Sequence, residues 1–110
     1  MPEAEVSVVL VTAPDGDTAE RLGRVLVEER LAACVNVLPA ITSIYRWEGR
    51  VETDEETLLM IKTSTGGFEA LRRRVVELHP YDTPEVLTLD VRDGSREYLD
   101  WVLGSVGGAS

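Results

Sequence analysis

Residue types that often build functional sites are scarce in this 110-residue sequence, which contains one cysteine, Cys34, and one histidine, His79. A single cysteine cannot form an internal disulfide. Soft and borderline metals need several converging nitrogen or sulfur donors, so these two residues alone predict no metal centre. No apolar run reaches the roughly 18 to 20 residues of a membrane span, and Met1 to Glu5 lack the basic segment of a secretory signal peptide. These absences predict a protein of the reducing cytoplasm.

Basic residues are also few, because 11 lysines and arginines stand against 20 aspartates and glutamates, a formal net charge of -9. This charge repels phosphate backbones and anionic lipids, so neither nucleic acid nor a membrane surface is an expected partner. The sequence is 44% hydrophobic and 28% charged, which is typical of folded proteins. Since single domains usually hold roughly 100 to 150 residues, one domain is expected over residues 1–110, with its ordered core at about 6–104.

Strands and helices are predicted to alternate along the chain. The β-branched apolar residues from Val6 to Thr12 predict a buried strand. Asp17 and Glu20 have the spacing of a capping box, so a helix is expected to begin at Asp17 and to end near Leu31 to Ala33. Period-two alternation predicts strands over Cys34 to Glu48 and Glu85 to Val91, and a further extended run predicts a strand over Val51 to Ser64. Apolar residues at helical spacing predict a helix over Phe68 to His79, and Ser95 is expected to cap a last helix that ends at Gly104.

This order, β-α-β-β-α-β with a terminal helix, matches the ferredoxin-like α+β sandwich, in which two helices cover one face of an antiparallel sheet. The tail from Gly107 is expected to fray.

The two central strands are expected to form a long β-hairpin around the turn Glu48-Gly49-Arg50, with a kink, bulge or edge at Pro39. Because two helices shield only one sheet face, apolar residues on both sides of this hairpin need another cover, and partner subunits are the simplest one. In the alternative, the hairpin is shorter and these residues fill the monomer core. The residues concerned are Ile41, Ile44, Tyr45, Trp47, Leu58 and Met60.

Three residues have side chains that could carry chemistry. Cys34 has the apolar neighbours of a buried thiol, which behaves as a small hydrophobe. His79 precedes Pro80 at a predicted helix end, where a structural role is expected. Lys62 follows an apolar run, so its ammonium must find a carboxylate, an anionic ligand or solvent at a cleft. Pairing with a neighbouring glutamate and binding of an anionic ligand both remain open.

Five motifs together resemble the CutA family of divalent-cation tolerance proteins. They stand in the order and near the spacing of that family, and they are Thr12 to Pro14, Arg30 to Asn36, Ser43 to Gly49, Glu56 to Thr63, and His79 to Glu85. The resemblance extends to Tyr98 and Trp101. It implies a ferredoxin-like subunit, a tight trimer built by the hairpin strands, similarity to the PII signalling proteins, and a link to copper and other divalent metals. It implies no established enzymatic reaction.

The resemblance also implies a functional cleft between subunits, lined by Tyr45, Trp47, Glu56, Lys62, Tyr81 and Glu85. Some members of the family have a cysteine just before the Thr-Ala-Pro motif and a second histidine before His-Pro-Tyr, which are proposed copper ligands. In this sequence Val11 and Leu78 occupy those positions, so only His79 remains of that set. Weak copper binding is therefore expected.

The leading hypothesis is a trimeric CutA-like protein of divalent metal tolerance that acts by binding or signalling and is not an enzyme. One alternative is a PII-like sensor that binds a small anionic metabolite at Lys62 between subunits. A second is an enzyme that uses Lys62, Tyr81 and Glu85 in a cleft. A third is a structural trimer that organises another protein.

Overall fold

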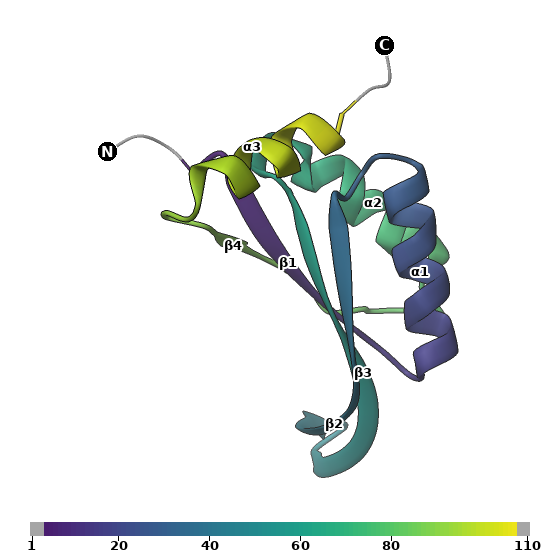
Figure 1. Cartoon of the computed structure of the whole chain (residues 1–110). Coiled ribbons are helices and arrows are strands. Elements are labelled where there is room, and N and C mark those ends of the chain that lie inside the picture. The colour runs from purple at the N-terminus through teal and green to yellow at the C-terminus, as the bar shows by residue number, and fades with distance from the viewer. Residues whose placement is uncertain (1–3, 108–110) are drawn as a thin grey trace.

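The computed structural model describes residues 4–107, which form four strands and three α-helices around one sheet (Figure 1). The predicted order of elements and the ferredoxin-like fold are confirmed. The predictions that concern residues 1–3 and 108–110, including the frayed tail, lie outside the described residues. The elements are β1 (Val6–Ala13), α1 (Gly16–Glu28), β2 (Cys34–Trp47), β3 (Arg50–Ser64), the short 3-10 helix η1 (Thr65–Gly67), α2 (Phe68–Leu78), β4 (Val86–Asp90) and α3 (Arg96–Ser105).

The sheet is antiparallel with the strand order β2-β3-β1-β4, so β1 and β3 are central. Alternate residues of these strands, such as Val9 and Ile61, pack against both α1 and α2 in one fully buried core. The opposite side of the sheet, here called the open face, carries the residues of the other parity. β1 and β3 therefore present apolar side chains to both faces, as the nearly continuous apolar run of β1 predicts.

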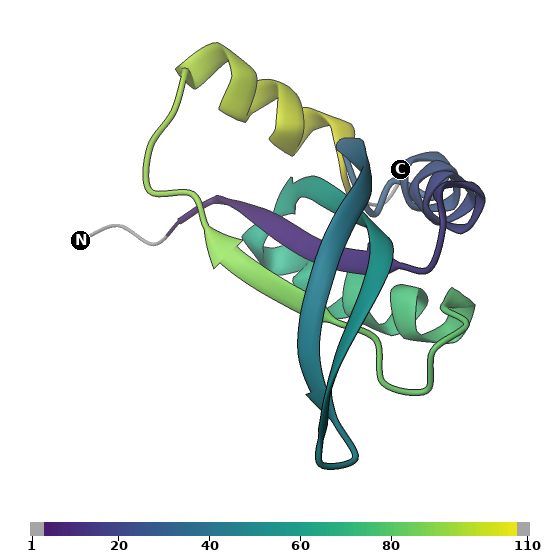
Figure 2. The same ribbon diagram turned by 90° about the horizontal axis from the view of Figure 1, so that it is seen from below.

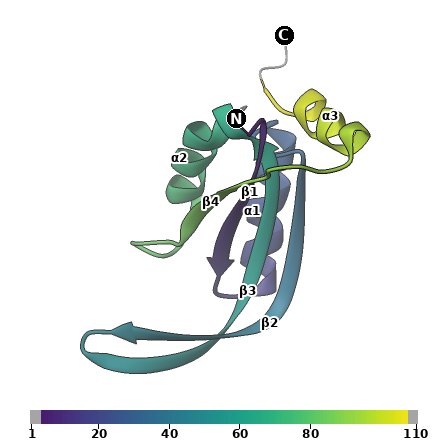
Figure 3. The same cartoon turned by 90° about the vertical axis from the view of Figure 1, so that its left-hand side faces the viewer.

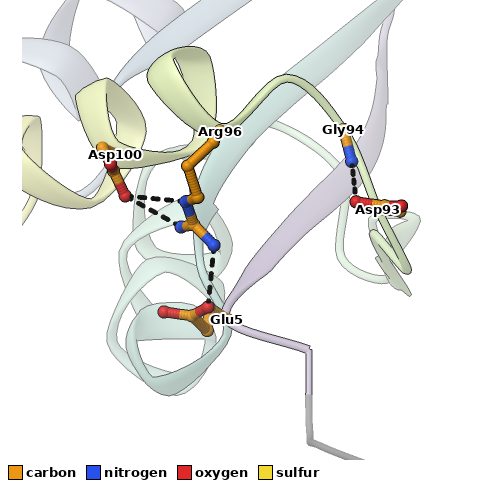
Figure 4. Close-up of polar contacts among 5 residues, drawn as sticks. All are labelled: Glu5, Asp93, Gly94, Arg96 and Asp100. Carbon is orange, nitrogen blue, oxygen red and sulfur yellow. Dashed lines mark hydrogen bonds and ion pairs between the residues drawn. The ribbon is translucent and has the colours of Figure 1, made fainter.

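Helix α3 covers only one end of the open face (Figure 2). Its buried Val102 packs against Val6 and Ala33. Arg96 holds the start of the helix in place, because its Nη2 lies 2.8 Å from Asp100 Oδ1 and its Nη1 lies 3.4 Å from Glu5 Oε1 (Figure 4). No other helix or strand formed by residues 4–107 covers the rest of the open face.

The predicted ends of the first helix are wrong at both termini. The N-cap is Asp15, whose Oδ1 accepts a hydrogen bond of 2.8 Å from Thr18 N, so Asp17 falls in the first turn. The helix ends at Glu28 because Arg30 takes the left-handed conformation at φ 60°, with Leu31 N donating to Leu26 O and Arg30 N to Val27 O. This is a Schellman motif with arginine in the position that glycine usually occupies.

The β2–β3 hairpin has the predicted irregularity and turn. Its register shifts between Leu38 and Ile41, so Pro39 lies in a bulge, and Ala40 has φ 60°. Glu48 and Gly49 both have positive φ in the tight turn, the geometry that lets hairpin strands keep their twist. The hairpin extends well beyond the helices (Figure 3). The shorter-hairpin alternative is wrong, because Trp47 is 58% exposed and its neighbours Ile44 and Tyr45 are exposed too.

None of the helices formed by residues 4–107 combines the length and the apolar composition that crossing a membrane requires.

Candidate functional site

Tyr45 and Asp54 form a cross-strand pair in the half of the β2–β3 hairpin nearest its turn. Tyr45 is opposite Glu52 and Asp54 is opposite Ser43, so Tyr45 and Asp54 are diagonal neighbours on one face. The Tyr45 hydroxyl donates a hydrogen bond to Asp54 Oδ2. This bond to a carboxylate, together with burial and the charges of Glu52 and Glu56, raises the pKa of Tyr45 to about 12. The Tyr45 hydroxyl is therefore a donor at every physiological pH.

Tyr81 makes an equivalent contact from the loop between α2 and β4. Its hydroxyl donates a hydrogen bond of 2.8 Å to Glu56 Oε2 on β3. Burial is the largest cause that raises the pKa of Tyr81 to about 12, and the Glu56 carboxylate is the next. Since Glu52, Asp54 and Glu56 alternate along β3, they point to the same face. We call Tyr45, Glu52, Asp54, Glu56 and Tyr81 the tyrosine–carboxylate patch.

His79 fixes the loop that carries Tyr81. Its Nδ1 accepts a hydrogen bond of 3.1 Å from Tyr81 N, so Nε2 carries the proton and donates to Thr12 O at 2.7 Å. The imidazole is only 7% exposed and lies 4.7 Å from the Tyr81 ring, centroid to centroid. The predicted structural role is confirmed, since both ring nitrogens are used to hold Tyr81 beside Glu56.

The residues of one chain do not fit the copper site that the family resemblance suggests. His79 has no free ring nitrogen, and Val11 is a fully buried part of the core. Between residues 4 and 107, no group of three or more histidine, cysteine, aspartate or glutamate side chains is arranged to hold a metal ion. The acidic residues of the patch are spaced along a strand and two of them accept tyrosine hydrogen bonds.

Lys62 lies away from the patch. It is six positions beyond Glu56 on β3, a separation of roughly 20 Å at about 3.3 Å per strand residue. Its Nζ donates a hydrogen bond to Asn36 Oδ1 on β2. The alternative in which Lys62 pairs with a neighbouring glutamate has no support within one chain, because no ion pair within residues 4–107 involves Lys62. The Lys62 ammonium is therefore hydrogen-bonded to a neutral amide, and no carboxylate of residues 4–107 pairs with its positive charge.

The six predicted cleft residues are thus brought together only in part within one chain. Tyr45, Glu56 and Tyr81 meet in the patch, whereas Trp47 is at the hairpin tip, Glu85 is exposed before β4, and Lys62 is at the far end of β3. Two surface cavities of about 310 and 300 Å³ lie elsewhere, one beside Arg96 and the other between α1 and β2. A cleft with all six residues would need a second copy of the chain.

Three of these neighbours were not predicted from the sequence. They are Asn36 beside Lys62, Asp54 beside Tyr45, and Tyr98 beside Cys34. The strand register alone would have placed Asn36 near Lys62, since Lys62 pairs with Cys34 two positions away. Cys34 itself is half-buried, and the expectation of a buried thiol is wrong, because β2 is an edge strand.

Comparisons with known proteins agree with the motifs. The sequence profile described as CutA1 divalent ion tolerance protein matches residues 7–105. The divalent-cation tolerance protein CutA of Thermus thermophilus is 52% identical over 100 residues, which is 91% of this chain and 97% of that protein. Mouse protein CutA is 48% identical over 97 residues, 88% of this chain and only 55% of the mouse protein. The solved T. thermophilus structure superposes with a TM-score of 0.91 at 51% identity, covering 93% of this chain and 99% of that one.

Proposed function

The chain belongs to the CutA1 divalent ion tolerance family, and from this premise we propose that it works as a homotrimer in the response to divalent metal ions, by binding or signalling and without catalysis. The cytoplasm is the compartment that we propose for it. Catalysis by Lys62, Tyr81 and Glu85 is disfavoured within one chain, because roughly 20 Å of β3 separates Lys62 from the Glu56 that Tyr81 contacts.

The uncovered open face is the observation that supports self-association. On the edge strand β4, Leu87 and Leu89 are 54% and 53% exposed, and they stand beside Leu10 and Val8 of β1 in the sheet register. The β2–β3 hairpin, which extends beyond the helices (Figure 3), also carries the exposed Tyr45 and Trp47. Contiguous apolar surface of this kind marks an interface in a stable protein. A hairpin that projects from one copy has the shape to reach the open face of another.

The oligomeric state tests this proposal. Sedimentation at micromolar concentration should show a trimer for the natural protein and a smaller species for Leu89→Glu. Val76→Glu is the matched control, because Val76 is also exposed, at 44%, but lies on α2 away from the open face. A natural protein that sediments as a monomer, or a Leu89→Glu variant that remains trimeric, would contradict the proposed interface.

A second candidate function is sensing of a small anionic metabolite, and the state of Lys62 favours it. An ammonium paired with a neutral amide on a half-buried strand can accept an anion without breaking an ion pair. Anion binding to the folded state raises its melting temperature. Inorganic phosphate is the simplest probe, and it should raise the Tm of the natural protein and of Lys62→Arg but not of Lys62→Ala. Equal shifts in all three would exclude Lys62 as the anion site.

A further inference from the structure

Four side chains from three elements meet where α3 crosses the end of the open face. Cys34 and Asn36 belong to β2, Lys62 to β3 and Tyr98 to α3. The Asn36 Oδ1 atom accepts hydrogen bonds from both Lys62 Nζ and Cys34 Sγ, the latter at 4.0 Å. A thiol and a primary amine therefore converge on one oxygen atom. This cluster is separate from the tyrosine–carboxylate patch.

The backbone keeps the thiol and the amine together. Cys34 and Lys62 are direct partners in the β2–β3 register. Directly opposed residues in an antiparallel pair have Cβ atoms about 4.5 to 5.5 Å apart, and the flexible lysine side chain can span that gap. Two groups held in this way react as if each were present at a very high local concentration.

Small reagents can reach the thiol. Cys34 is half-buried, and within residues 4–107 no strand pairs with the outer edge of β2. Tyr98 of α3 is near this sulfur, since the pKa of Tyr98 is raised first by burial and further by Cys34.

We propose that Cys34 and Lys62 form a peroxide-responsive pair in which oxidation of the thiol leads to a covalent sulfenamide bond between β2 and β3. In the first step the Cys34 thiolate attacks hydrogen peroxide and the O–O bond breaks, which gives the Cys34 sulfenic acid and hydroxide; the hydroxide takes up the proton that the thiol had released and becomes water, so sulfur is oxidised and peroxide is reduced. In the second step the neutral Lys62 amine attacks this sulfur, an S–N bond forms, the S–O bond breaks, and a second water molecule leaves. Thiols reverse the bond by attack on sulfur.

The arrangement favours the amine over the other fates of a sulfenic acid. A disulfide needs a second cysteine, and the chain has only one. Further oxidation needs a second peroxide molecule, whereas the amine is already in place. The bond would also remove the positive charge of Lys62 from the open face, so peroxide would change the electrostatics of this surface. This chemistry does not depend on metal tolerance or on anion sensing.

The test is intact-mass spectrometry of the 110-residue protein after treatment with hydrogen peroxide. The natural protein should become lighter by about 2 Da, the mass of the two hydrogen atoms lost, and dithiothreitol should restore the original mass. Peptide mapping should place the link between Cys34 and Lys62. Lys62→Arg keeps the positive charge but lacks the primary amine, so it should gain oxygen, up to about 32 Da for the sulfinic acid.

In Cys34→Ser, the peptides that contain residues 34 and 62 should show neither the link nor added oxygen at position 34, so this variant serves as the second control. The proposal is overturned if the natural protein yields only heavier products or disulfide-linked dimers, if it does not react, or if Lys62→Arg also loses about 2 Da, because the nitrogen would then come from another group.

Discussion

The two tyrosines of the patch should titrate abnormally, and removal of their carboxylate partners should have unequal effects. The pKa of Tyr45 is raised chiefly by its hydrogen bond to Asp54, whereas that of Tyr81 is raised chiefly by burial. Asp54→Asn should therefore return the pKa of Tyr45 most of the way to its ordinary value. Glu56→Gln should lower the pKa of Tyr81 only in part. Glu55→Gln is the matched control, since Glu55 has the opposite parity on β3.

The raised pKa of Tyr81 also predicts how the stability of the fold depends on pH. Tyr81 ionises near pH 10 in the unfolded chain and near pH 12 in the folded one. Its contribution to the free energy of unfolding is complete below pH 10 and is lost as the pH rises to 12, because the unfolded state then holds fewer protons. Two pKa units would correspond to roughly 2.7 kcal/mol, but the side chain is 37% exposed, so solvent screening reduces the contribution to about 1 kcal/mol.

The assay is the ultraviolet absorbance of tyrosinate after rapid pH jumps that end before unfolding. Tyr98→Phe removes the third tyrosine, and a further change of Tyr45 or Tyr81 to phenylalanine isolates each remaining signal. Tyrosines of the folded protein that titrate near pH 10 would refute the assigned contacts. Equal effects of Asp54→Asn and Glu55→Gln on Tyr45 would refute the role of Asp54 in particular.

Two further predictions concern metal and the first helix. Calorimetric titration should show only weak Cu(II) binding, equally weak in the natural protein and in His79→Gln, because both ring nitrogens of His79 are hydrogen-bonded. Submicromolar, stoichiometric binding that is lost in the variant would show that the histidine is a ligand. In thermal unfolding, Asp15→Ala should lower the Tm more than Asp17→Ala, because Asp15 caps the helix through Thr18 N; the reverse ranking would restore Asp17 as the cap.

Much of the fold could be predicted from local patterns. Period-two alternation located β2, apolar residues at helical spacing located α2, and Pro39 marked the bulge. The errors came where two local signals compete. Asp15 and Asp17 are both of a residue type that caps helices well, so the sequence does not decide between them. Nothing in the sequence identifies Arg30 as a left-handed residue, since only the packing of the following segment stabilises this conformation.

The residues of the candidate site could be predicted from the sequence, but their contacts could not. The family motifs named Tyr45, Glu56, Lys62 and Tyr81, but side-chain partners depend on register and on the path of loops that are distant in sequence.

By itself the sequence determined the order of elements, the two-sided apolar character of the central strands and the family, because these follow from residue periodicity and motif order along the chain. Only the tertiary structure decided that His79 uses both nitrogens to seat Tyr81, that Lys62 stands beside Cys34 and far from Tyr45 and Tyr81, and that the edge position of β2 leaves the thiol half-buried. The physical reason is that hydrogen-bond partners and burial are set by strand pairing and loop closure, which join residues as far apart as Thr12 and His79.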